Sequence, residues 1–124
     1  MEGLVPGRIV YFVFGPQDAE QVNRRRTNVR SIADRIQTET WPIGAQAHIG
    51  NDVREGDIVP AMVLRVWSPD GNVNLKVMLD GSDTYWATSV GYAEAIPGSL
   101  KVRSWHWMFD GQDKRYTPDV AKTS

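Results

Sequence analysis

Residues 57–89 read DIVPAMVLRVWSPDGNVNLKVMLDGSDTYWATS, and this stretch decides the fold. Its three apolar runs are separated by turn sequences, SPDG at 68–71 and DGSD at 80–83. The second run places one alternating set on one side: Val73, Leu75, Val77 and Leu79. The first run places Ile58, Met62, Leu64 and Val66 on one side and Val59, Val63 and Trp67 on the other. Period-two alternation between Gly-, Pro- and Asp-rich turns predicts a three-stranded β-meander.

This meander needs a cover, because three strands alone do not form a stable unit. Residues 8–14 (RIVYFVF) predict a central strand that is covered on both faces. Residues 44–49 predict a short strand, and 101–109 (KVRSWHWMF) predict another with Trp105 and Trp107 on one face. Pro60 has no N–H to donate, so its strand should begin at a sheet edge or a bulge.

Residues 17–37 predict helix, because apolar residues recur there at three- and four-residue spacing. Pro16 suits the first turn, and Asp18 and Glu20 complement the helix dipole. The apolar spacing is interrupted at Arg24–Arg26, so we favour two short helices with a break at Thr27–Asn28 over one continuous rod.

Together these elements predict an α+β fold. We expect a small twisted antiparallel β-sheet or partly closed barrel, packed with one or two N-terminal helices. Residues 1–109 form a single domain, in which 90–100 is an irregular loop rich in Gly and Pro. Residues 110–124 are polar and without periodicity, and we expect them to form a C-terminal tail.

Composition excludes several classes of function. The 124 residues carry a formal net charge of −1, too little positive charge for a general nucleic-acid coat. No apolar stretch is long enough to cross a membrane. The chain has no cysteine, which excludes disulfides and thiolate chemistry and fits a reducing cytosol. With two histidines, no nucleophile-elbow motif and no glycine-rich phosphate loop, we expect no enzymatic activity, no cofactor and no metal site.

The densest positive charge lies at Arg24, Arg25 and Arg26, followed by Thr27. At a helix corner, guanidinium groups can bind phosphate oxygens in a bidentate manner. The alternative is a solvated helix face, because three consecutive side chains cannot all point the same way. A second polar group is Gln46, His48 and Asn51, which can read a base edge or a ribose, although a structural role for His48 is the commoner case.

Tryptophan is unusually frequent, with five residues at 41, 67, 86, 105 and 107. In a small β-protein most tryptophans belong to the core. Because each buried indole N–H needs a partner, we expect at least one or two to line a pocket or an interface. The candidates for stacking on a base are Trp41, Trp86 and Trp105.

Six segments together resemble a group of small proteins that tailed phages of actinobacteria encode, mostly without assigned function. They are VPGRIVYFV, NRRRT, WPIGAQAHIGN, EGDIVPAMVLRVW, LDGSDTYWATS and the closing WHW, and they span most of residues 5–107. The chain departs from that group in a longer tail beyond Trp107. Phage accessory proteins of this size are similar in kind to the "sponges" that sequester cyclic oligonucleotides or cyclic ADP-ribose derivatives and so disarm CBASS or Thoeris defence.

This resemblance implies a non-catalytic phage protein in the host cytoplasm that binds a cyclic nucleotide immune signal, as a homodimer or larger assembly. The predicted ligand-binding residues are Arg24, Arg25, Arg26, Thr27, Trp41, Gln46, His48, Asn51, Trp86 and Trp105. Two alternatives remain open. One is a protein–protein inhibitor or structural phage component that uses its tryptophans as an interface hot spot. The other is a nucleic-acid-binding module, which the net charge disfavours.

Overall fold

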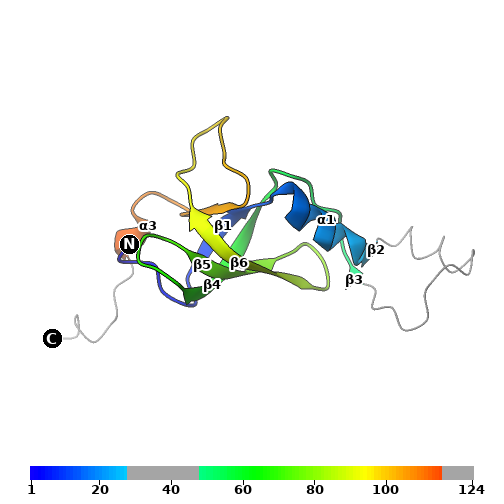
Figure 1. Ribbon diagram of the computed structural model, residues 1–124, viewed down its shortest axis with the longest axis horizontal. Coiled ribbons are helices and arrows are strands. Elements are labelled where there is room, and N and C mark those ends of the chain that lie inside the picture. The colour runs from blue at the N-terminus through cyan, green and yellow to red at the C-terminus, as the bar shows by residue number, and fades with distance from the viewer. Residues whose placement is uncertain (28–47, 116–124) are drawn as a thin grey trace, which may run out of the picture.

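The computed structural model of the chain describes residues 1–27 and 48–115, with only the backbone described at 26–27, 48–49 and 114–115 (Figure 1). Its centre is a closed barrel with the strand order β1–β4–β5–β6–β7. The strands are β1 (Ile9–Val13), β4 (Ile58–Val66), β5 (Val73–Met78), β6 (Thr84–Tyr92) and β7 (Ser104–His106). This confirms the predicted α+β class with a small barrel.

The predicted meander is formed by β4, β5 and β6, which pair antiparallel in chain order. Val73, Leu75 and Val77 point into the barrel and are fully buried, as the alternation predicts. Pro60 pairs with Tyr11 of β1, whereas the ladder to β5 begins only at Ala61. The proline therefore lies at the end of that ladder, where its missing N–H interrupts no pairing.

Two β-bulges in the meander change which side chains point into the barrel. The β4–β5 register shifts between Val63 and Arg65, so that Val66 packs against the core although Leu64 and Trp67 are exposed. The buried Asn74 is placed between this bulge and one in β6. Its Oδ1 accepts hydrogen bonds from Trp67 Nε1 (2.8 Å) and from the Ser89 backbone N–H (2.9 Å). A bulge bends its strand, and this bending helps to close a barrel.

Barrel closure depends on β7, which pairs antiparallel with β1 and parallel with β6. This parallel pair makes the sheet mixed, whereas we expected an antiparallel one. The β1 strand is central, as predicted, because β4 and β7 pair with its two sides. Residues 93–103, between β6 and β7, form a loop that projects from the barrel (Figure 1).

The core fills the barrel with aliphatic and aromatic side chains. Its largest fully buried members are Trp105, Phe12, Phe14 and Leu75. Trp105 lies on β7, and its indole Nε1–H donates to the Gly71 carbonyl at 2.7 Å, so its one polar atom is satisfied inside the core.

Helix α1 (Pro16–Arg24) covers one end of the barrel and begins with the proline in its first turn, as predicted. Ala19 and Val22 are buried against the core. The helix ends at Arg24, with Arg25 as its C-cap, and Arg26–Thr27 form the short strand β2. The break therefore falls at the arginines, slightly before Thr27–Asn28; the predicted second helix lies outside the described residues.

Strand β2 pairs in parallel with β3 (His48–Ile49) in a separate two-stranded sheet. Of the strand predicted at 44–49, these two residues are the part that the structure describes. At the opposite end of the barrel, the short helix α3 (Gln112–Arg115) follows β7 (Figure 1).

Gln112 is buried and extends the packed part of the chain past Phe109. Its Nε2 donates to the Ile9 carbonyl (2.9 Å), and its Oε1 accepts from the Met108 N–H (2.6 Å). Arg8 Nη2 donates to the Gln112 carbonyl at 2.7 Å. These bonds join the residues after β7 to β1.

Candidate ligand-binding site

Several of the predicted binding residues gather where α1 ends. We define the β2–β3 end of the barrel as residues 25–27, 48–51 and 80–86. The parallel pairing of β2 and β3 places Arg26 in register with His48, and Thr27 with Ile49. An isolated bridge joins Gly50 to Gly81 in the β5–β6 turn. Three segments that are distant in sequence therefore meet at one end of the barrel (Figure 1).

Arg25 connects α1 to the beginning of β6. Its Nη2 donates to the Thr84 carbonyl at 2.8 Å, and its Nε lies 3.2 Å from Asp83 Oδ2. Its guanidinium carbon lies 5.7 Å from the centre of the Tyr85 ring, a cation–π distance. Arginine has five N–H donors, so these contacts hold the group in place and leave donors for a ligand.

Trp86 lies two residues after Thr84, on the outer face of β6. Arg25 bonds the Thr84 carbonyl and lies over the Tyr85 ring, and because adjacent residues of a strand point to opposite sides, Trp86 projects from the other face of β6. Trp86 is 65% exposed, and its cross-strand neighbour is the exposed Lys76 of β5. An exposed indole beside a lysine can stack on a base while the ammonium group meets a phosphate.

Tyr85 attaches helix α1 to the start of β6, because its side chain points into the protein. Its hydroxyl lies 2.6 Å from Asp18 Oδ1, which also lies 3.3 Å from Arg103 Nη1. Burial, together with the neighbouring Asp18 carboxylate, raises the pKa of Tyr85 to about 12. The phenol therefore stays protonated and holds α1 on β6 at neutral pH.

The acidic residues at this end limit its positive charge. Asn51 Nδ2 donates to Asp80 Oδ2 at 2.6 Å, and its backbone N–H donates to the Asp80 carbonyl at 3.1 Å. Asp83 faces Arg25. A bound phosphate must therefore compete with Asp83 for Arg25, which favours a ligand with more than one recognised group.

Some predicted residues do not join the site. Arg24 forms an i,i+4 pair with Glu20 at 2.6 Å, and both side chains are largely exposed, so Arg24 fits the solvated-face alternative. The prediction that Trp105 stacks on a base is wrong, because Trp105 is fully buried in the core. Trp41 and Gln46 lie outside the described residues.

Sequence reasoning missed Asp83 and Tyr85 as neighbours of Arg25, and Lys76 as a neighbour of Trp86. Lys76 alternates with the inward-facing Leu75 and Val77, which predicts an exposed cation but not its position beside Trp86. Asp83 and Tyr85 follow a predicted turn, and only the tertiary packing of α1 brings Arg25 to them.

Comparison of the chain with protein-family models, with curated proteins and with solved structures finds no match. Within residues 1–27 and 48–115, no helix has both the length and the apolar character that a membrane span requires. The functional argument therefore depends on the geometry of the chain itself.

Proposed function

We propose that this chain is a non-catalytic protein that captures a small phosphorylated nucleotide at the β2–β3 end of the barrel. Arg25 and Arg26 hold phosphate, Trp86 stacks on a base, and His48 and Asn51 add polar contacts. The observation that supports this most is the meeting of three distant segments, in which Arg25 bonds to Thr84 two residues before Trp86 and Arg26 lies in register with His48.

The chemical class of the ligand extends this proposal. From the resemblance to small phage proteins, we take the ligand to be a cyclic oligonucleotide or a cyclic ADP-ribose derivative that serves as an immune signal. A phage protein that sequesters such a signal in the host cytoplasm blocks the defence system that depends on it. A stack of one base on an indole contributes about 1–3 kcal/mol, and a hydrogen bond to a charged group about 1.5–3 kcal/mol.

Calorimetric titration with a panel of cyclic dinucleotides, cyclic trinucleotides and cyclic ADP-ribose derivatives tests the proposal. At least one ligand should bind, and Trp86→Ala should weaken it by about fivefold to 150-fold, the equivalent of about 1–3 kcal/mol. Trp67→Ala is the matched control, because Trp67 is also exposed (51%) but lies outside the proposed site. It follows the last residue of β4, and its ring packs under the Arg65 guanidinium. Absence of heat with every ligand in the panel contradicts the proposal.

A second candidate function is protein binding, as an inhibitor or a structural phage component, and one observation favours it. The outer face of β4 exposes large apolar side chains, with Ile58 and Leu64 each 43% exposed, and Trp67, which follows the strand, is 51% exposed. Exposed apolar residues that gather on one face are typical of interfaces, including those between copies of one chain. Light scattering with Leu64→Asp tests it: loss of a dimer or larger assembly supports this function, and a monomeric parent protein contradicts self-association.

A further inference from the structure

The end of the barrel opposite α1 contains a pocket. It has a volume of about 260 Å³ and lies between the end of β6, the residues after β7 and the start of α3. Three aromatic side chains line it: Tyr92, Trp107 and Phe109. Trp105 positions two of them, because its ring makes edge-to-face contacts with Tyr92 (5.0 Å) and with Trp107 (4.9 Å).

Three carboxylates share this pocket with the aromatic rings: Glu94, Asp110 and Asp113. No lysine or arginine is among the described residues that line it, so its formal charge is negative. Burial raises the pKa of Tyr92, and Glu94, Asp113 and Asp110 raise it further. Because the three carboxylates line one pocket and have the same sign, their potentials add inside it.

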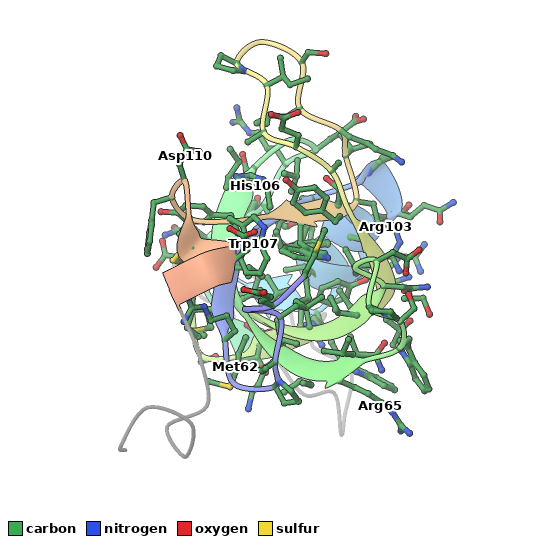
Figure 2. All side chains as sticks on the ribbon, turned by 90° about the vertical axis from the view of Figure 1, so that its left-hand side faces the viewer. Met62, Arg65, Arg103, His106, Trp107 and Asp110 are labelled. Atoms are coloured by element: carbon green, nitrogen blue, oxygen red, sulfur yellow. The ribbon has the colours of Figure 1, made fainter. Side chains whose placement is uncertain are left out.

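His106 provides an observation independent of the charge. It lines the pocket, it is 7% exposed, and its Nδ1 is buried without a hydrogen-bond partner among the described residues. Burial lowers the pKa of His106, so the imidazole is neutral at physiological pH. A buried polar nitrogen without a partner is uncommon in folded proteins, so the hydrogen bonding of His106 is incomplete beside this pocket. Figure 2 shows His106, Trp107 and Asp110 on the same side of the molecule, above α3.

The volume of the pocket and the spacing of its acidic side chains limit the kind of ligand that can bind. Pockets for drug-sized ligands measure about 300–1,000 Å³, so a cavity of about 260 Å³ is too small for a nucleotide and suits one small group. Within the part of the chain that the structure describes, no three His, Asp or Glu side chains are close enough together to hold a metal ion. The three carboxylates are therefore spaced too widely to bind a bare metal ion together.

We propose that this pocket binds an organic cation, either an alkylammonium or a guanidinium group. The three rings offer cation–π faces, and the three carboxylates supply the opposite charge. The same chemistry is carried by a free small amine and by a lysine or arginine side chain of a peptide. The site is separate from the nucleotide site, because it lies at the other end of the barrel (Figure 1).

The test uses the full chain and pairs of probes that differ in charge. Choline is titrated against its neutral isostere 3,3-dimethylbutan-1-ol, while the Trp107 indole N–H is followed by NMR. N-acetyl-lysine amide and N-acetyl-arginine amide represent the peptide source. We expect a saturable shift of the Trp107 signal with at least one cation and none with the neutral isostere. The probe that binds most tightly shows whether the natural ligand is a free amine or a lysine or arginine side chain of a peptide.

Two exposed residues provide variants that leave the core intact, Phe109→Ala and Asp110→Asn. Each should weaken cation binding by about two- to fivefold, and the double variant by about tenfold. Trp86→Ala at the opposite end should leave it unchanged. The proposal is overturned if the neutral isostere shifts Trp107 as strongly as choline, if no cation shifts it, or if the double variant binds like the parent protein.

Discussion

At the scale of single residues, Asp18 determines how α1 attaches to the barrel. It is 4% exposed, and a carboxylate that is removed from water needs strong partners. Tyr85 donates its hydroxyl to Asp18, and Arg103 lies against the same oxygen while its Nη2 donates to the Thr88 carbonyl at 2.8 Å. These contacts join α1, β6 and the segment before β7.

The Tyr85→Phe variant tests this attachment. It removes the hydroxyl and leaves the buried Asp18 oxygen with fewer partners, so the free energy of unfolding should fall by about 1–3 kcal/mol in urea denaturation. Tyr11→Phe is the control, because Tyr11 is half-buried on β1 and its hydroxyl makes no hydrogen bond within the described residues. Equal effects of the two variants contradict the assignment.

The raised pKa of Tyr85 also predicts a loss of stability in alkali. The folded-state pKa of about 12 exceeds the value of about 10 for an unfolded tyrosine, so the folded state retains the proton longer. The Tyr85 phenol therefore contributes fully to the free energy of unfolding below about pH 10, and this contribution is lost as the pH rises towards about 12. Urea midpoints measured across this window should fall more steeply for the parent protein than for Tyr85→Phe; parallel curves argue against the raised pKa.

The tryptophans show what single residues reveal before the fold is known. The sequence predicts that at least one or two of the five line a pocket or an interface; in the structure Trp67 and Trp86 are exposed. It does not predict which ones, because Trp86 and Trp105 both lie in alternating strands. Only barrel closure decides that Trp105 faces Gly71 in the core while Trp86 faces outward.

At the scale of elements, the C-terminal turn of α1 is held by one side chain. Asn23 Nδ2 donates to the Val53 carbonyl (2.8 Å), and Asn23 Oδ1 accepts from the Val53 N–H (2.9 Å). A single amide thus satisfies both backbone groups of a buried loop residue. This contact fixes the loop before β4 against the helix that leads to Arg25.

Asn23→Ala should therefore be costly. It leaves the Val53 N–H and C=O without these partners, and we expect a destabilisation of about 2–3 kcal/mol in chemical denaturation. The neighbouring Arg24→Ala is the matched control and should cost less than about 1 kcal/mol, because its exposed pair with Glu20 contributes little. Comparable losses in the two variants rule out this role for Asn23.

Most of the elements follow from local sequence pattern, and the exceptions depend on long-range contacts. The meander, the central strand and the helix that begins at Pro16 are visible as periodicity and turn residues. The inward orientation of Val66 is not visible in the sequence, because the bulge after Val63 shifts the β4–β5 register. Asn74 stabilises the shifted register. The burial of Gln112 is equally hidden, since its partners Ile9 and Met108 lie in other segments.

At the scale of the whole molecule, the two proposed sites lie at opposite ends of the barrel, and only the second has an excess of carboxylates. The arginine site was predictable in part, because three consecutive arginines are conspicuous. The acidic pocket was not, because Glu94 lies in an irregular loop and Asp110 and Asp113 follow the last predicted strand. Barrel closure by β7 brings these segments together.

The central claim is that the β2–β3 end captures a nucleotide, and native mass spectrometry of the protein purified from infected cells tests it most directly. We expect a bound species of nucleotide mass that is released on denaturation, is lost in Trp86→Ala and is retained in Trp67→Ala. Protein that carries no added mass, or an adduct that Trp86→Ala retains in full, contradicts the claim.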